Sequence, residues 1–372
     1  MAQQHLDPTD PTARSVTGDA LAGYLRGQAT EFLRALRLHR ETGNGQNGTE
    51  DSVDAARALR HSARRISGSL HTFRPLLDAD WSEAMRPELA WLSGTLALEH
   101  ACAARLERLL LALHRLSGST AFPAQSAASA VGGRVVGAGR GVPAATGGRA
   151  PGTGPTVTPT ATAERGNLTV GAAKAGALLE RQLTLARTRA HSSALQALGS
   201  SRFHAVADKV AVLASEVPLT PAATGADLRP LAAAAGERLT DAVTTLPLVT
   251  AGHPYNAEAL IHGLSPDTAP HPQDGPWHQV RLLLRLHRYA GEVLHGDDAP
   301  TDVRLLTAGQ ALNLHRDASE AAAAAASAAR TPRIAPATAY ALGVLHADQR
   351  HEVEAARFAF QQSWQKQAVG TP

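Results

Sequence analysis

The stretch from Ser52 to Asp78 carries the clearest pattern of apolar and basic positions in the chain. Its apolar residues recur at intervals of four and three, which places them on one side of a helix. They are Leu59, Ala63, Ile66, Leu70, Phe73 and Leu77. A second arc, about 100° wide and well away from the first, is basic. It holds Arg57, Arg60, Arg64, His71 and Arg74, with no acidic residue from Arg57 to Arg74. Like charges one turn apart repel each other, so we expect this face to meet an anion, either a carboxylate of another helix or a ligand.

Helical periodicity continues through most of the chain. In the first half it predicts helices at about 19–40, 52–75 and 87–117. The last of these is expected to begin near Pro87, because proline suits the first turn of a helix. In the second half it predicts helices at about 170–198, 202–215, 226–246, 277–295, 301–330 and 336–366. Runs in which β-branched and polar residues alternate are almost absent, so the sequence predicts an all-α fold.

The composition changes between the two halves. Residues 119–163 consist mainly of Gly, Ala, Pro, Ser and Thr, with three arginines and no acidic residue. Such a segment cannot bury enough apolar surface to order itself. We therefore predict a flexible linker at 119–165, which separates a first helical unit at 15–118 from a second at 166–366.

Charge and cysteine content limit the function classes. The net charge is only +3, which is too small to predict nucleic-acid binding. The chain has 33 arginines and 3 lysines. A GC-rich genome would produce that excess by codon usage, whereas the planar donors of arginine would also suit phosphate. The single cysteine, Cys102, excludes an intramolecular disulfide and a thiolate metal site. Neither a signal peptide nor an apolar run long enough to span a membrane is present, so a cytoplasmic location is expected.

A second predicted helix repeats the pattern of the first. His278, Arg281, Arg285 and Arg288 share an arc of about 80°, and the apolar residues of that helix lie elsewhere. Codon usage raises the abundance of arginine but does not set its phase on a helix. Two helices with a phased basic row therefore favour a functional role for the arginines.

Several segments resemble one family. RHSARRISGSLHTFRPLLDADW (60–81), followed by LAWLSGTL (89–96), resembles the first repeat of the CHAD domain, the conserved histidine α-helical domain. WHQVRLLLRLHRYAGEVL (277–294) is similar to the second repeat of that family. SRFHAVADKVAVLASEVPL (201–219) and YALGVLHADQRHEVEAARFAFQQSW (340–364) are also similar to it. The resemblance spreads over about 15–366 outside the linker.

This resemblance implies an internally duplicated fold, with two antiparallel bundles of three to four long helices related by pseudo-twofold symmetry. It implies basic grooves that bind inorganic polyphosphate, and association with polyphosphate granules. Carried over to this chain, the residues facing the anion are Arg57, Arg60, Arg64, Arg65, His278, Arg281, Arg285 and Arg288. His315 and Asp317 stand where the family places a later His and Asp, and we include His315 among the expected site residues.

The chain departs from the family pattern mainly in the first repeat. Arg57 replaces a histidine, Ser67 replaces an arginine, and His100-Ala101 replaces an Arg-Asp pair. In the second repeat Arg285 stands for a lysine and Asn313 for a glycine. We therefore expect the second repeat to be the better ligand-binding half.

Other functions lack a complete motif. HEVEA at 351–355 has an alanine at the second ligand position of a zinc-protease helix, and GAGRG at 137–141 lacks the GK[ST] of a phosphate-binding loop. We expect no enzyme activity, cofactor or metal. A general polyanion or nucleic-acid binder is one alternative, although a helix-turn-helix, a zinc module and stacking aromatics are missing. A helical scaffold for protein partners is the other, in which the arginines pair with carboxylates on solvated faces.

Overall fold

The computed structural model describes residues 16–43, 49–118, 159–253, 264, 271–296 and 302–365. All long elements within these residues are α-helices, and the β-type pairing found there is an isolated bridge between Leu77 and Leu219. The all-α prediction is confirmed. Residues 119–158, most of the predicted linker, lie outside the described residues. The division into two repeats stays a prediction.

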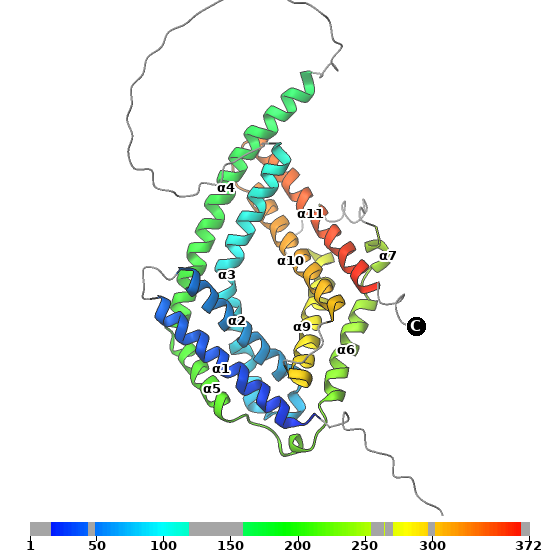
Figure 1. Cartoon of the computed structure of the whole chain (residues 1–372). Coiled ribbons are helices and arrows are strands. Elements are labelled where there is room, and N and C mark those ends of the chain that lie inside the picture. The colour runs from blue at the N-terminus through cyan, green and yellow to red at the C-terminus, as the bar shows by residue number, and fades with distance from the viewer. Residues whose placement is uncertain are drawn as a thin grey trace, which may run out of the picture.

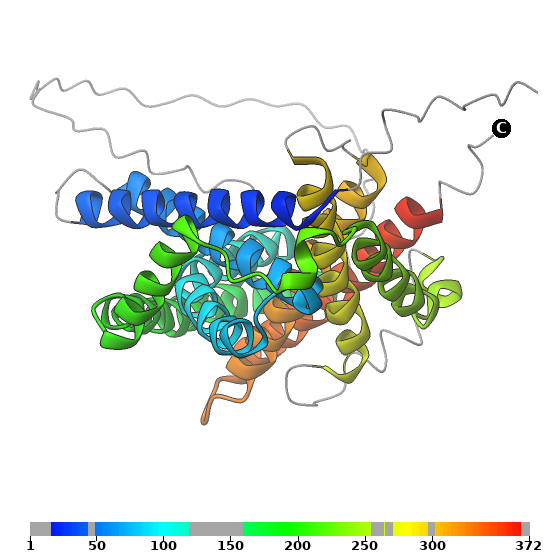
Figure 2. The ribbon, with the colours of Figure 1, turned by 90° about the horizontal axis from the view of Figure 1, so that it is seen from below.

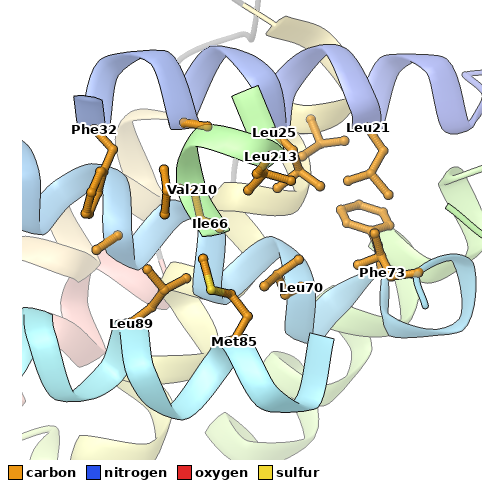
Figure 3. Close-up of a cluster of buried hydrophobic side chains, with 14 of the residues drawn as sticks. Leu21, Leu25, Phe32, Ile66, Leu70, Phe73, Met85, Leu89, Val210 and Leu213 are labelled. Carbon is orange, nitrogen blue, oxygen red and sulfur yellow. The ribbon is translucent and has the colours of Figure 1, made fainter. Parts of the chain in front are cut away.

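One core forms between helices from both sides of the linker (Figure 1). It packs α1 (Gly18–Gly43), α2 (Thr49–Thr72), the first part of α3 (Ala79–Ser117) and α5 (Ser201–Ser215). All six apolar positions of the predicted stripe are buried, none exposed by more than 2%. The last two, Phe73 and Leu77, follow the end of α2 and flank the turn η2 (Arg74–Leu76). Figure 3 shows Ile66 and Leu70 of this stripe close to Met85 of α3 and to Val210 and Leu213 of α5. The apolar face of α2 therefore holds first-half and second-half helices together.

A second core lies along the longest helices. α3 and α4 (Pro159–Leu198) run side by side and pack on α10 (Val303–Ala329) and α11 (Pro336–Gln365) (Figure 1). The alanine-rich part of α10 supplies buried positions here, and these are Ala321, Ala325 and Ala328. Small side chains allow close approach of helices, so the alanine run is a packing face.

A third core joins α6 (Arg229–Thr244), α7 (Leu248–Ala251) and α9 (Gly275–His295) to the first part of α10 and the last part of α11. Trp277 of α9 is buried, and its ring meets the ring of Phe360 edge-on, with centroids 5.7 Å apart. The described residues also form three short 3-10 turns, η2 (Arg74–Leu76), η3 (Pro221–Thr224) and η4 (Pro272–Asp274). Figure 2 shows α1 along one side of the molecule, with α2 and α3 beneath it. α9 lies beside both α2 and α10.

Two predicted helix boundaries were wrong. α3 begins at Ala79, because Asp78 caps it by accepting a hydrogen bond from the backbone N–H of Trp81 at 2.8 Å. Pro87 lies inside this helix, where burial of Met85 and Leu89 on either side compensates for the missing hydrogen bond. α4 begins at Pro159 rather than near residue 170, within the segment predicted as linker. No helix in the described part of the chain has an apolar stretch that could cross a bilayer.

Candidate functional site

A cavity of about 1200 Å³ lies between α2, α3, α6, α9 and α10. Its lining is rich in arginine. These arginines are Arg60, Arg64, Arg65, Arg105, Arg108, Arg229, Arg281, Arg285, Arg288 and Arg316. Glu292, Asp302, Asp317 and Glu320 are the carboxylates of the lining. Ten guanidinium groups against four carboxylates leave an excess of six positive charges, counting histidine as neutral.

The two basic rows predicted on separate helices face this same cavity. α2 contributes three arginines of the lining and α9 contributes three. They meet because α9 packs on the last turns of α2, where Tyr289 and Leu286 are buried close to Gly68. The arrangement of the helices therefore combines two modest basic faces into one strongly positive site.

Glu292 pairs with the arginines near the C-terminal end of α9. Its Oε2 accepts hydrogen bonds from the Tyr24 hydroxyl and from Arg65 Nε, both at 2.8 Å. Its Oε1 lies 3.4 Å from Arg288 Nε. The carboxylate joins α1, α2 and α9, and it neutralises part of the charge of both rows at that end.

A second group of ion pairs involves α10. Arg105 Nη2 of α3 lies 2.5 Å from Glu320 Oε2. Arg316 Nη2 lies 2.5 Å from Asp317 Oδ1, and its Nε is 3.8 Å from Glu320. Asp317, which the family resemblance marked, is thus engaged with the neighbouring arginine of its own helix.

Four arginines of the two rows have no carboxylate within ion-pairing distance in the described part of the chain. These are Arg60, Arg64, Arg281 and Arg285. Arg281 donates to the side-chain oxygen of Asn313 at 3.3 Å. The Nε atoms of Arg60, Arg281 and Arg285 are buried and have no hydrogen-bond partner among the protein groups described. Buried donors of this kind require a partner, and an anion in the cavity would supply one.

The pKa values of these four groups reflect burial first and crowded positive charge second. Burial, followed by the charges of Arg285 and Arg60, lowers the pKa of Arg64 to about 10. Burial and then Arg285 and Arg316 lower the pKa of Arg281 to about 9. The pKa values of Arg60 and Arg285 are lowered too, mainly by burial. All four stay charged at neutral pH, so the free cavity holds repelling cations that a bound anion would stabilise.

A histidine on α2 shares this environment. His61 lines the cavity, and burial followed by the charge of Arg60 and its arginine neighbours lowers its pKa. The imidazole is therefore neutral at pH 7. An anion in the cavity would oppose the effect of the arginines and favour its protonated form.

Three expected site residues lie outside the cavity lining, and these are Arg57, His278 and His315. Arg57 is exposed on α2, and its Nη1 is 2.5 Å from Asp54 Oδ1. His278 is half-buried at the start of α9, and its Nε2 is buried without a hydrogen-bond partner in the described residues. Its ring meets the ring of His315 edge-on, with centroids 5.5 Å apart. Their role as ligands, expected from the family resemblance, stays a prediction, and the exposed, paired position of Arg57 argues against it for that residue.

His315 is fully enclosed, being only 1% exposed, and it belongs to a buried polar network. Burial lowers its pKa to about 4 against the opposing effect of Asp274, so the ring is neutral at pH 7. Its Nε2 accepts a hydrogen bond from Arg357 Nε at 3.3 Å. The ring stacks on Trp277, with centroids 5.6 Å apart. In this position His315 packs against Trp277 at the start of α9 and does not line the cavity.

The centre of the network is Asp274, which is 0% exposed. Arg350 donates to both of its carboxylate oxygens, at 2.8 and 3.3 Å, and Arg357 Nη2 donates to Oδ1 at 2.7 Å. The Ser319 hydroxyl makes a short hydrogen bond to Oδ2. Arg357 also donates to Glu354 at 2.7 Å. The carboxylate therefore connects the residue before α9 with α10 and α11.

The sequence interpretation missed four arginines of the cavity: Arg105, Arg108, Arg229 and Arg316. For the two on α3 a signal exists in the sequence. Arg105 and Arg108 share one helical face with three alanines, and these are Ala97, Ala101 and Ala104. Small residues beside long basic ones leave room for a ligand, which is a pattern distinct from the fully basic row of α2.

Among the residues that the structure describes, no three His, Cys, Asp or Glu side chains are grouped as they would be around a metal ion.

Comparisons with known proteins give a consistent result. The model of the CHAD domain family matches residues 27–326. Among solved structures, PptA from Streptomyces chartreusis is similar to this chain with a TM-score of 0.72 and 68% sequence identity, over 94% of this chain and 99% of PptA. A search of curated proteins finds no match.

Proposed function

The chain belongs to the CHAD domain family, and from this premise we propose that it binds inorganic polyphosphate in the arginine-lined cavity without acting on it as an enzyme. The observation that carries the proposal is the group of four arginines, two from α2 and two from α9, that lack a carboxylate partner in the described structure. Such a group fits a ligand with closely spaced negative charges.

Polyphosphate has the matching chemistry. It carries a negative charge on every unit, so consecutive units can meet guanidinium groups from both rows. Each charge-assisted hydrogen bond contributes about 1.5–3 kcal/mol. That exceeds the few tenths of a kcal/mol by which neighbouring like charges on one helix repel each other. The excess positive charge of the lining supports binding of a polyanion in preference to a single phosphate.

Nucleic acid fits this lining less well. Proteins that bind single strands stack bases on exposed aromatic rings. Among the described residues, the cavity lining contains one Phe, Tyr or Trp side chain. This is Tyr289, which is only 6% exposed. The guanidinium carbons of Arg65 and Arg288 lie 6.0 and 5.3 Å from the centre of its ring. A base therefore has no free ring on which to stack.

Titration with long-chain polyphosphate over a salt series tests the proposal, with duplex DNA as competitor. Binding is expected to weaken with salt because counterions are released. Four neutralised charges on a single chain predict a slope of about −3 in log K against log salt. Undetectable binding at low salt would reject the proposal. Equal competition by DNA would favour a general polyanion binder, and binding that does not need the arginines would favour a scaffold.

Arg57 and Arg60 are predicted to differ in importance, although they lie one turn apart on α2. Arg60→Ala should weaken polyphosphate binding about tenfold, through the loss of one charge-assisted contact. Arg57→Ala should leave affinity unchanged, because this side chain is exposed and pairs with Asp54 outside the cavity lining. The two variants have the same net charge, so a difference between their affinities reports position. Equal affinities would contradict the placement of the site in the cavity.

The proposal includes a cytoplasmic location, expected from the sequence, and association with polyphosphate granules, which the family resemblance implies. Imaging a fluorescently tagged chain together with stained granules tests this part.

A further inference from the structure

The two basic helices approach each other closely at a glycine of α2. A Cβ atom built on Gly68 of α2 would lie 2.6 Å from Cδ2 and 3.2 Å from Cε2 of Tyr289 on α9. It would also lie 3.3 Å from Cδ2 of Leu286. The first distance is 0.8 Å short of the 3.4 Å at which ordinary contact begins. Any residue larger than glycine at position 68 would therefore force α2 and α9 apart or displace the ring.

The ring that fills this space has little freedom to move. Tyr289 and Leu286 are only 6% and 8% exposed. The contacting atoms Cδ2 and Cε2 belong to the ring itself rather than to the end of a flexible chain. The guanidinium carbons of Arg65 and Arg288 lie 6.0 and 5.3 Å from the centre of the ring. Glu292 then ties Arg65 and Tyr24 to α9 by hydrogen bonds of 2.8 Å. A shift at Gly68 must be taken up by the backbones of the two helices.

The separation of these helices determines how the arginines reach a ligand. Gly68 lies one turn after Arg64, and Tyr289 lies one turn after Arg285. Arg285 is close enough to Arg64 that its charge adds to burial in lowering the pKa of Arg64. The distance between packed helices depends on the side chains at their contact. Charge-assisted hydrogen bonds require donor and acceptor within about 2.7–2.9 Å. A wider gap would prevent one anion from meeting both rows.

We propose that Gly68 is a positioning residue, which sets the separation of α2 and α9 so that arginines of both helices bind the same polyanion. The inference rests on the proposed function, because it concerns the same cavity. The affinity for polyphosphate would then depend on a residue that carries no charge and no hydrogen-bonding side chain.

The test compares two glycine-to-alanine variants by titration with long-chain polyphosphate at fixed ionic strength. Gly68→Ala is expected to bind about tenfold more weakly than the wild type, a loss equivalent to one charge-assisted contact. Gly94→Ala is the matched control, because Gly94 is exposed in helix α3 with nothing within 4 Å of its added Cβ. Both changes raise helix propensity equally, so a difference between them reports the contact with Tyr289.

A compensating variant separates positioning from misfolding. In Gly68→Ala with Tyr289→Leu, the smaller side chain leaves room for the added methyl group. This double variant is expected to bind within about twofold of Tyr289→Leu alone. Gly68→Ala that is helical by circular dichroism and binds like the wild type would overturn the inference. If Gly68→Ala does not fold, a folded double variant that binds much more weakly than Tyr289→Leu would also overturn it. Failure of the wild type to bind polyphosphate would instead reject the proposed function.

Discussion

Replacing Arg281 and Arg285 together by glutamate is expected to abolish polyphosphate binding, with a loss of at least about 100-fold in affinity. These residues are two of the four arginines without a carboxylate partner in the described cavity. Each charge reversal removes two units of positive charge, so the excess in the lining falls from six to two. Titration calorimetry with long-chain polyphosphate at low salt measures the effect.

The fold should tolerate this double change. The new carboxylates would face Arg64 and Arg316, whose charges already act on Arg281, and would form ion pairs where cations now repel one another. A matched control is Arg26→Glu with Arg37→Glu, which alters net charge by the same amount at exposed positions of α1 outside the cavity lining. Loss of binding in both double variants would indicate a long-range effect of net charge. Binding of the cavity variant within a few-fold of wild type would contradict the assignment of the site.

The sequence predicts the helices well because burial repeats with the helical period. The stripe from Leu59 to Leu77 is buried along its whole length in the structure. Both basic rows could also be predicted, since their phase relative to the apolar stripe is a property of one helix. The sequence of one helix does not show which part of the folded protein its basic face will meet. That both rows face one cavity depends on the packing of α9 on Gly68, a contact between residues more than two hundred positions apart.

The buried network could not be predicted from local pattern. Asp274 ends the turn η4 in a part of the sequence rich in proline and histidine, and nothing near it in the sequence marks it as buried. Its partners, Ser319, Arg350 and Arg357, lie on α10 and α11 and appear as ordinary polar residues of amphipathic helices. His315 was expected to face the ligand by resemblance alone, whereas it lies 1% exposed inside this network. The partners of Asp274 and His315 are distant in sequence, so these contacts can be identified only from the three-dimensional structure.

Replacing Asp274 by asparagine is expected to destabilise the fold by about 3–5 kcal/mol, the usual cost of leaving buried charges without their partner. Asparagine keeps the shape of the side chain but removes the negative charge that Arg350 and Arg357 share. Both guanidinium groups are buried, at 2% and 4% exposure, so water cannot replace the carboxylate. The midpoint of thermal unfolding should fall by about 10 °C. Thermal denaturation followed by circular dichroism measures this change.

The pH dependence of this effect has a definite sign. Burial raises the pKa of Asp274, but the neighbouring His315 and Arg350 lower it further, so its pKa lies well below the usual range for aspartate. A carboxylate with a depressed pKa stabilises the fold above the pKa of the unfolded chain, about 3.9. That contribution is lost as the pH falls through the folded-state pKa. The difference in stability between wild type and Asp274→Asn should therefore be constant near neutral pH and shrink in acid.

Asp54→Asn is the control for the loss of an acidic residue, because Asp54 pairs with Arg57 on the exposed surface of α2. Solvent screens such a pair, so this variant should unfold at the wild-type temperature. An unchanged unfolding temperature for Asp274→Asn would mean that Arg350 and Arg357 find another anion, for which Glu354, already bonded to Arg357 at 2.7 Å, is the nearest candidate. Burial comes first among the influences on Glu354 and raises its pKa. Arg357 and Arg350 already act on it in the opposite direction and favour its charged form, so in the variant this one carboxylate would have to serve two buried guanidinium groups. The large destabilisation of Asp274→Asn follows from this shortage of buried negative charge.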